Sequence, residues 1–238
     1  MIDKDIYNPE FVRNLFNEMA GTYDRVNYIT SFGFSLRWRR QFISKLRSDN
    51  KNLRILDLMT GMGETWNIIQ SNFPHSTIDA LDYSDVMVSK AKTKVIRYKI
   101  ENLTVLHDNA LASNINDHTY DIVTCAFGLK TFNEEQFEIL AKEVSRILKP
   151  DGAISFIEIS VPKNIILKSL YGFYTGTIIP IIGKLMLGKP ENYKMLWRYT
   201  VRFKNCDLAC KAFKDHNFEI SKESYFWGCS TGFTGRKR

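Results

Sequence analysis

The chain has few cysteines, and none of them stands in a spacing typical of a metal site or of a disulfide framework. Four cysteines are scattered through 238 residues, with no C-x-x-C pair and no paired histidine. Cys206 and Cys210 lie four positions apart, a spacing that arises by chance on a helix more often than it marks a metal site. We therefore expect free thiols in a reducing cytoplasm and no bound metal.

Long uninterrupted apolar runs are also missing. The most hydrophobic region, residues 165–187, contains Lys168 and Lys184 and is broken by three glycines and a proline. The uncharged part between the two lysines is shorter than the roughly 20 apolar residues that a membrane span needs. The first residues are charged and no apolar segment follows them, so we expect no signal peptide. The sequence predicts a soluble, cytoplasmic protein with one apolar segment, and peripheral contact with a membrane stays open.

Internal repeats and low-complexity linkers are absent as well, which argues against a repeat array or several tethered domains. A length of 238 residues suits one α/β domain with a local insertion. The formal net charge of +7 admits a nucleic-acid or anionic-membrane partner. Much of this charge, however, lies on dispersed lysines such as Lys90, Lys94 and Lys99, for which a solvated helix surface is the simpler interpretation.

The most informative stretch that is present is an apolar strand leading into a turn with two glycines. Gly61 and Gly63 would let a ligand approach the backbone closely. A second strand delivers Asp82, nineteen residues after Gly63, where a carboxylate can accept hydrogen bonds from both hydroxyls of a ribose. NAD and FAD sites use a third glycine beneath their pyrophosphate, but here that position is Trp66. S-adenosylmethionine has no pyrophosphate and fits this turn better.

Apolar, β-branched runs alternate with helical patterns from residue 53 onward. Strands are predicted at 53–58, 77–81, 103–106, 120–127 and 153–159, and helices at 64–73, 84–99 and 134–148. Ser84 is the expected N-cap of the helix at 84–99, and the sequence at 149–152 predicts a helix stop followed by a turn. The last two strands, 218–227 and 229–234, meet at Gly228 and should pair antiparallel. The fold class is therefore α/β, a doubly wound, Rossmann-like methyltransferase sheet ending in an antiparallel hairpin.

Two helical segments interrupt this alternation, and we expect them to roof the site. Helical stretches near 9–20, 24–31 and 35–48 precede the first strand, and a further helix around 192–202 follows the apolar segment. The whole chain, 1–238, is predicted to be one domain with four parts. These are an N-terminal helical lid (1–50), a cofactor-binding half (51–161), an apolar helical substrate roof (162–203), and a last helix with the antiparallel hairpin (204–238).

Several long motifs in a fixed order carry a resemblance to a known family. They are Tyr23-Asp24-x-x-Asn27-x-x-Thr30-Ser31-x-x-x-Ser35-x-x-Trp38-Arg39-Arg40, Tyr120-Asp121-Ile122-Val123 with Ala126-Phe127-Gly128-Leu129, Arg146-Ile147-Leu148-Lys149-Pro150-Asp151-Gly152 with Glu158-Ile159-Ser160, Pro180-Ile181-Ile182-Gly183, Tyr193-x-x-Leu196 and Gly235-Arg236-Lys237. This chain resembles the ubiquinone/menaquinone biosynthesis C-methyltransferase family from about residue 11 to its end.

The resemblance implies an enzyme, an S-adenosylmethionine-dependent methyltransferase that adds a methyl group to a ring carbon of a prenylated quinol. A quinol carbon becomes nucleophilic when an adjacent phenol loses its proton, so a base or an activated water should assist. The implied partner is a small apolar or aromatic substrate, with no nucleic acid and no metal. A homodimer stays open.

Carried over from the family, the cofactor contacts fall on eight positions. They are Tyr23, Gly61, Met62, Gly63, Asp82, Asn109, Ala110 and Ala126. Asp82 would bind the ribose, Asn109 and Ala110 would lie beside the adenine, and Ala126 near the methionine moiety. Asp108 is an alternative acid for the adenine. Tyr23, with Asp24, would belong to a lid over the cofactor.

Departures from the family pattern bear on the chemistry. Lys130 stands where the family has an arginine near the reaction, and Glu64 closes the turn where aspartate is usual; these are our two candidate catalytic residues. Met62 replaces a small hydroxyl residue, and its sulfur could contact the sulfonium region of the cofactor. Ser35 stands where the first motif of the family has a histidine. The substrate pocket is expected to include Tyr171, Tyr174, Trp197 and Tyr199, of which the last two lie in a stretch that departs from the family's Pro-Glu-Ser.

These departures leave three alternatives to the quinol enzyme. The first is a paralogue that methylates a specialised metabolite at carbon, nitrogen or oxygen through a reshaped pocket. The second is a cofactor-binding protein that no longer transfers a methyl group. The third, an RNA methyltransferase, is disfavoured because residues 125–130 lack the Asn/Asp-Pro-Pro-aromatic sequence that stacks a flipped base.

Overall fold

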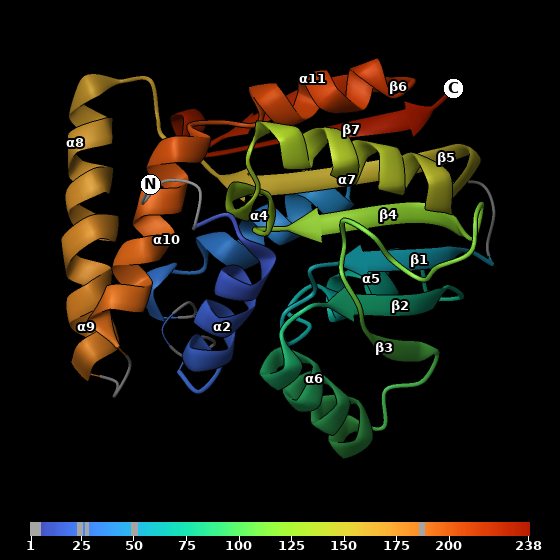
Figure 1. Ribbon diagram of the computed structural model, residues 1–238, viewed down its shortest axis with the longest axis horizontal. Helices are drawn as coiled ribbons and strands as arrows, with labels where there is room; N and C mark the ends of the chain where they lie inside the picture. The colour runs from blue at the N-terminus through green and yellow to red at the C-terminus, as the bar shows by residue number, and fades with distance from the viewer. Residues whose placement is uncertain (1–5, 23–25, 27–28, 49–51, 186–188) are drawn as a thin grey trace.

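The computed structural model describes residues 6–22, 26, 29–48, 52–185 and 189–238. A seven-stranded sheet of order β3-β2-β1-β4-β5-β7-β6 forms its centre (Figure 1). The strands are β1 (Arg54–Leu58), β2 (Thr77–Asp82), β3 (Leu103–His107), β4 (Tyr120–Ala126), β5 (Leu148–Ile159), β6 (Phe218–Tyr225) and β7 (Ser230–Lys237). The first five are parallel, whereas β7 runs antiparallel between β5 and β6. The predicted sheet and its final hairpin are confirmed.

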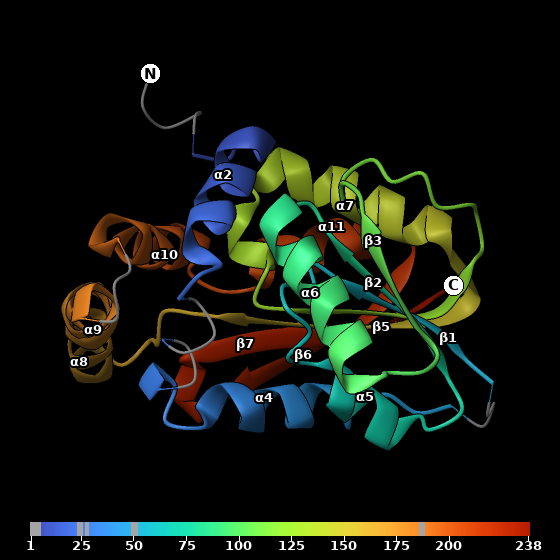
Figure 2. The same ribbon diagram turned by 90° about the horizontal axis from the view of Figure 1, so that it is seen from below.

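Helices cover both faces of the sheet (Figure 2). Two lie on one face, α4 (Phe34–Ile43) and α5 (Trp66–Asn72), and two on the other, α7 (Glu134–Ile147) and α11 (Asp207–Asp215). Helix α6 (Asp85–Tyr98) packs against β2 and β3, and its predicted N-cap is confirmed because the Ser84 hydroxyl accepts a hydrogen bond from the backbone N–H of Met87. The main core fills the space between the sheet and the pair α7 and α11.

The predicted turn at 149–152 is wrong in one respect: these residues belong to β5. Tyr120 pairs with Leu148, but Ile122 pairs with Ala153, so four residues of β5 form an irregularity opposite one residue of β4. Asp151 adopts a left-handed conformation there, with φ of +60°. The turn chemistry read from the sequence therefore produces a bulge inside the ladder.

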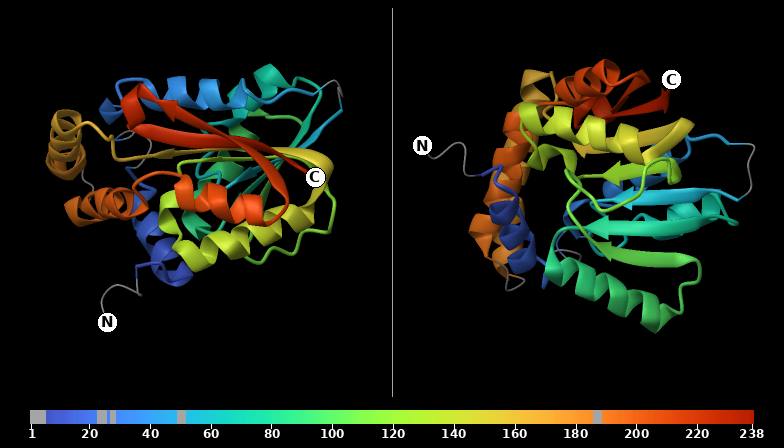
Figure 3. Two further views of the ribbon diagram at one scale, coloured as in Figure 1. Left: turned by 90° about the horizontal axis from the view of Figure 1, so that it is seen from above. Right: turned by 45° about the vertical axis from the view of Figure 1, so that its right-hand side comes forward.

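The remaining helices gather at the edge where the parallel strands end (Figure 3). They are α2 (Pro9–Met19), α8 (Ile165–Phe173), the π-helical turn η2 (Tyr174–Ile178), α9 (Ile179–Leu185) and α10 (Pro190–Phe203). Two short 3₁₀ turns contribute residues to the same region: η1 (Leu129–Thr131) lies between β4 and α7, and η3 (Phe226–Gly228) joins β6 to β7. Part of the helix predicted at 24–31 lies outside the described residues.

Glycines on the 165–185 run make room for aromatic side chains of α10. A Cβ at Gly172 or Gly176 would lie 3.1 or 3.0 Å from the indole of Trp197, and one at Gly183 would lie 2.5 Å from the ring of Tyr193. The helices therefore approach closely, and one face of the apolar segment is held against α10.

Candidate active site

Two cavities open at the carboxyl ends of the parallel strands. The first, here the strand-tip cavity, has about 900 Å³ of empty space that is partly open to solvent, and Gly61, Asp82, Asn109 and Ala126 lie in its wall. These residues follow or end β1, β2, β3 and β4, so four neighbouring strand tips contribute one residue each. The opposite side of the cavity is closed by Val12 and Phe16 of α2 and by Tyr7, which precedes this helix. Ligand sites of open parallel sheets form at this edge.

Asp82 is held rigidly at the tip of β2. Its carboxylate accepts hydrogen bonds from the backbone N–H groups of Gly61, at 2.8 Å, and Ser84, at 2.9 Å. Desolvation raises the pKa of this carboxyl above its ordinary value, although these backbone hydrogen bonds oppose the shift. A carboxylate has about four lone-pair positions, so two remain for ligand hydroxyls.

The two glycines of the turn have different tasks. Gly61 lines the cavity with φ of +59°, and a Cβ there would meet only Glu64, at 3.6 Å. Gly63 does not line it; a Cβ there would lie 2.3 Å from the Trp66 indole. Close ligand approach thus explains Gly61, whereas our expectation for Gly63 is corrected: Trp66 requires it.

Met62 also points away from the cavity. It is buried in a small cluster with Ala20 and Met87, and its backbone carbonyl accepts a hydrogen bond from Lys94. The expectation of a thioether contact with the cofactor is not supported by this position. The hydroxyl residue that the family carries here is replaced by a side chain that packs α2 onto α6.

A chain of hydrogen bonds supports the turn from below. The Trp66 indole N–H donates to the Thr60 hydroxyl at 2.8 Å, which donates to the Asp57 carboxylate at 2.5 Å. Thr124, on β4, donates to the other Asp57 oxygen at 3.1 Å. Burial raises the pKa of Asp57 to about 6. Asp57 therefore ties the turn to two strands and does not face the cavity.

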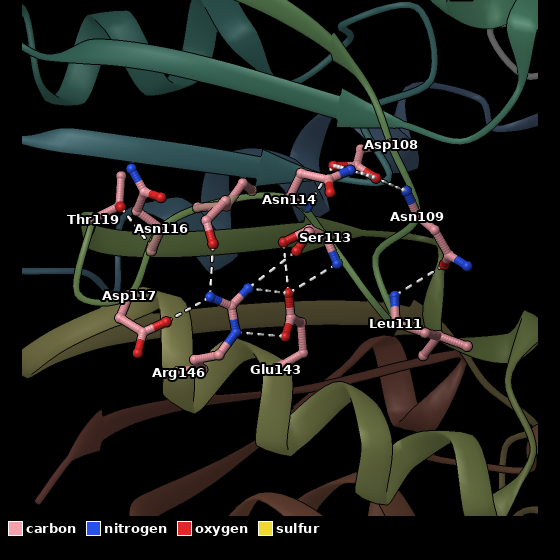
Figure 4. Close-up of polar contacts among 11 residues, drawn as sticks. Asp108, Asn109, Leu111, Ser113, Asn114, Asn116, Asp117, Thr119, Glu143 and Arg146 are labelled. Carbon is pink, nitrogen blue, oxygen red and sulfur yellow. Dashed lines mark hydrogen bonds and ion pairs between the residues drawn. The ribbon is translucent and has the colours of Figure 1, made fainter.

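At the tip of β3, Asn109 and Ala110 line the cavity, and Asp108 does not. The Asp108 carboxylate accepts hydrogen bonds from the backbone N–H groups of Asn109 and Asn114, both at 2.8 Å, as Figure 4 shows. Its geometry is that of a loop residue, which argues against the alternative that Asp108 is the adenine acid.

The rest of this loop is fastened by Arg146 of α7 (Figure 4). Its guanidinium forms a two-point contact with Glu143, at 2.9 and 2.7 Å, and donates to the carbonyl of Ser113 at 3.2 Å. Glu143 in turn accepts a hydrogen bond from the Ser113 hydroxyl at 2.6 Å. The motif residue Arg146 thus orders the loop that carries Asn109.

The second cavity, here the outer cavity, lies between α4, η1 and the helices at 165–203, and its empty space of about 1420 Å³ is partly open to solvent. Most of its wall is apolar or aromatic. Tyr171, Tyr174 and Trp197 line it, together with Phe34 and Leu167. The Tyr174 hydroxyl donates to the carbonyl of Thr30 at 2.6 Å, which ties the 165–185 run to the N-terminal region.

The expectation that Tyr199 lines this cavity is corrected. Tyr199 is fully buried, its hydroxyl donates to the carbonyl of Ile6, and its ring lies edge-on to Tyr7, with 5.8 Å between the ring centroids. Two residues along an α-helix are about 200° apart. Trp197 and Tyr199 therefore cannot face the same cavity from α10.

Lys130 forms a buried ion pair at the floor of the outer cavity. Its ammonium lies 3.0 Å from the Glu158 carboxylate and also donates to the carbonyl of Phe127 at 2.5 Å. Lys130 is 2% exposed and Glu158 is fully buried. Glu158 accepts two further hydrogen bonds, from the backbone N–H groups of Lys130 and Ile159.

Arg39 and Phe127 line both cavities, so they form the junction between them. The Arg39 guanidinium lies over the Phe127 ring, 4.7 Å from its centroid, and 3.8 Å from the Glu64 carboxylate. Phe127 adopts φ of +69°, an uncommon conformation for a side chain of this size. Glu64 lines only the strand-tip cavity.

Sequence reasoning did not assign Arg39, Glu158 or the α2 residues to the site. A signal for Glu158 was available, because an acid inside an apolar strand must find a partner. Arg39 stands in a quoted motif, but its burial at the junction depends on how α4 packs onto the sheet. Tyr23 lies outside the described residues, so its predicted role in a lid stays a prediction.

The strand order, the glycine turn and the acid at the β2 tip together define an S-adenosylmethionine-dependent methyltransferase. The chain belongs to the ubiE/COQ5 methyltransferase family, whose model matches residues 4–237. It is 31% identical over 232 residues to a demethylmenaquinone methyltransferase of Geobacillus sp. (strain WCH70), covering 96% of this chain and 97% of that one. A protein of the same name from Staphylococcus aureus (strain MRSA252) is 30% identical over 233 residues, covering 97% and 94%.

Solved structures share the fold at low sequence identity. A methyltransferase of Thermotoga maritima matches with a TM-score of 0.62 and 16% identity over 94% of this chain and 99% of that one. Phosphoethanolamine N-methyltransferase 2 of Haemonchus contortus, crystallised with S-adenosyl-L-methionine, matches with a TM-score of 0.60 and 14% identity over 92% of this chain and 60% of that one. The predicted enzyme class and cofactor are confirmed.

The residues present in the strand-tip cavity fit this cofactor. The Asp82 carboxylate keeps acceptor positions for a ribose, and the open space beside Gly61 leaves the turn accessible to a ligand. Trp66 stands beneath the turn at the position where the dinucleotide-binding motif has its third glycine.

Proposed function

We propose that this enzyme methylates a ring carbon of a prenylated quinol, as the names of its demethylmenaquinone methyltransferase relatives suggest. One observation carries the proposal: the strand-tip cavity meets a larger, mainly apolar cavity at a single junction. The outer cavity, with a volume of about 350 Å³ and further space open to solvent, has room for an aromatic ring and part of an isoprenoid chain. Its wall would give the reacting carbon mainly apolar surroundings.

The cofactor supplies an electrophilic methyl group on a sulfonium. We assign Asp82 to its ribose, Asn109 and Ala110 to its adenine, and Ala126 to the wall beside its methionine moiety, all of them residues of the strand-tip cavity. The enzyme then has to hold the acceptor carbon in line with that methyl group, with the quinol in its more nucleophilic, deprotonated form.

Cations are better placed than bases to promote that deprotonation. The described residues that line the outer cavity include no carboxylate and no histidine, whereas Arg39 and Lys130 both reach it. A phenol of pKa about 10 ionises more easily beside a positive charge. We therefore propose that Lys130 keeps its predicted catalytic role as an electrostatic one, moderated by Glu158, and that the proton leaves to water.

A turnover assay with isotope-labelled S-adenosylmethionine tests the proposal. One reaction receives a demethylmenaquinol, and a second receives a low-molecular-weight extract of the native cells. Label on the quinol ring, located by mass spectrometry, is the expected result. Label only on another metabolite would establish the specialised paralogue, and no label with intact cofactor binding would establish a protein that has lost methyl transfer.

The bulky residues that suggested a specialised paralogue have a structural explanation at one position. The Trp197 indole packs against Gly172 and Gly176, so part of its volume lies between two helices and the rest faces the outer cavity. This supports a cavity that still accepts a ring with a long tail. The exchange of a family histidine for Ser35, which lines the outer cavity, gives the paralogue its remaining support.

We also propose that the enzyme docks onto an anionic lipid surface through the 165–185 run. Among the described residues this is one helical stretch long and apolar enough to cross a membrane by length and composition, and little of it is buried. Since α10 covers one of its faces, we propose that it lies on the bilayer. Its exposed apolar residues are Ile165, Ile166, Leu170, Phe173, Ile181 and Leu185. Phe32 and Phe226 are exposed and line the outer cavity, and the exposed Trp227 ring lies beside Phe226.

Charge and continuity support this partner over a second copy of the chain. Lys168 and Lys184 are exposed on the same run and would meet anionic headgroups. Leu170 and Phe226 are both exposed and part of the outer cavity, so the apolar surface continues into the proposed substrate site. A prenylated substrate could then enter from the lipid. The cytoplasmic location and a homodimer remain predictions.

Flotation with phosphatidylglycerol-containing vesicles tests the docking. Phe173→Glu should abolish flotation, whereas Ile96→Glu, a matched exposed residue on α6, should not. A wild-type protein that does not float, or a Phe173→Glu variant that still floats, would overturn the proposal. Light scattering on the same variants shows whether the apolar face instead joins two copies.

A further inference from the structure

Arg39 is the buried cation whose surroundings satisfy it least. Its side chain is 9% exposed, and its Nε–H has no hydrogen-bond partner within the described part of the chain. The contact with Glu64 is long for an ion pair, at 3.8 Å, and the guanidinium also lies over the face of the Phe127 ring. Asp57 interacts with it electrostatically, without a hydrogen bond between them. A buried guanidinium with an unmade hydrogen bond is costly, so this geometry points to an anionic ligand.

The position of Arg39 indicates which anion. Along the sheet edge, Asn109, Asp82 and Gly61 follow the tips of β3, β2 and β1 in spatial order. With the adenine and ribose assigned to the first two, the amino-acid end of the cofactor falls beyond Gly61, toward β4. Arg39 and Glu64 line the strand-tip cavity there, and Glu64 lies against Gly61.

We infer that Arg39 binds the α-carboxylate of S-adenosylmethionine, and that Glu64 faces its α-ammonium group. A loose pair of opposite charges complements a zwitterion, because each charge of the ligand finds an opposite partner. A guanidinium offers a fork of N–H donors that matches a carboxylate. Glu64, predicted above as catalytic, becomes a cofactor-binding residue in this assignment, which rests on the proposed orientation of the cofactor.

The junction gives this contact a second consequence. The same guanidinium lines the outer cavity, so a bound carboxylate would fix its position over Phe127 before the acceptor enters. The cofactor would thereby complete one wall of the acceptor site. Acceptor affinity should then depend on the presence of the amino-acid end of the cofactor.

Calorimetry with two probes separates this role from a general effect on the cavity. S-adenosylhomocysteine carries the carboxylate, and 5′-methylthioadenosine lacks it. Arg39→Gln should weaken S-adenosylhomocysteine about 10- to 100-fold, as expected for a hydrogen bond to a charged group, and leave methylthioadenosine within about twofold. Arg40→Gln is the matched control, since Arg40 is exposed on the same helix and does not line either cavity.

Each other outcome has a definite meaning. Equal loss for both probes would show damage to the whole cavity, and no loss for either would remove Arg39 from cofactor binding; both overturn the inference. Unchanged cofactor affinity with weaker acceptor binding would assign Arg39 to the acceptor oxygen, which also overturns it. A wild-type protein that binds neither probe would instead count against the cofactor assignment itself. Thermal unfolding of Arg39→Gln, compared with Arg39→Lys, verifies that the variants are folded.

Discussion

Replacing Lys130 by methionine removes one half of a buried ion pair and leaves the other half in place. The Lys130 ammonium lies 3.0 Å from the Glu158 carboxylate, in a site where the two side chains are 3% and 0% exposed. Methionine matches the lysine stem in length but has no charge. The variant therefore leaves the Glu158 carboxylate buried, with no other cation paired to it among the described residues.

The cost follows from what Glu158 would keep and lose. Its carboxylate would retain the backbone N–H groups of Lys130 and Ile159, at 3.0 and 2.7 Å, and would lose its neutralising charge. Removing one partner of a buried pair typically costs about 3–5 kcal/mol. Native domains are stable by about 5–15 kcal/mol, so Lys130→Met should fold but unfold at much lower denaturant concentration.

A double-mutant cycle in urea measures this effect. Glu158→Gln removes the buried charge, so the double variant Lys130→Met/Glu158→Gln should recover at least about half of the loss seen in Lys130→Met. The pair is not coupled as described if the free energy of unfolding of Lys130→Met lies within about 1 kcal/mol of the wild-type value. The same conclusion follows if the effects of the two single substitutions simply add. Turnover of Lys130→Met, measured where it is fully folded, should still fall more than its cofactor affinity.

Three further predictions concern the turn and its supports. Asp82→Ala should weaken S-adenosylhomocysteine by about 2 kcal/mol in calorimetry, because the ribose loses charge-assisted hydrogen bonds; unchanged affinity in a folded variant would contradict the ribose assignment. Burial raises the pKa of Asp57 to about 6, so the folded protein binds this proton more tightly than the unfolded chain does. The tighter proton binding stabilises the fold fully below about pH 4, and this stabilisation is lost as the pH rises through 6. In Asp57→Asn, the urea concentration at the unfolding midpoint should change less between about pH 4 and 7 than it does in the wild type. An unaltered pH dependence would count against the raised pKa of Asp57. Both glycines have positive φ, so alanine at either position costs some stability. Gly63→Ala should lower the melting temperature more, since its Cβ would also lie 2.3 Å from the Trp66 indole, and Gly61→Ala should weaken cofactor binding more; the reverse pattern would contradict these separate roles.

The parts of the fold that depend on neighbouring residues were predictable from the sequence. Alternating apolar runs located the seven strands, and the glycine turn with Asp82 at the next strand tip identified the cofactor edge. These features follow from local periodicity and from the rule that parallel strands end at one edge. The bulge in β5 was misread because turn residues also suit an irregular ladder.

Only the tertiary structure decided which side chains share a cavity. Trp197 and Tyr199 are two positions apart on α10, yet one faces the outer cavity and the other the Ile6 carbonyl. Gly63 serves the indole of Trp66, which is packed beneath the turn.

The charged centre of the site follows the same rule. Lys130 reads in the sequence as a catalytic cation, but its charge is shared with Glu158, which lies 28 residues away in the chain. The types of residue and their strand positions are thus determined locally. Which way these side chains point, and which charges are paired, is determined by packing. In an interior without water, a buried charge such as that of Lys130 is stable only beside an opposite charge, and that partner can lie far away in the sequence.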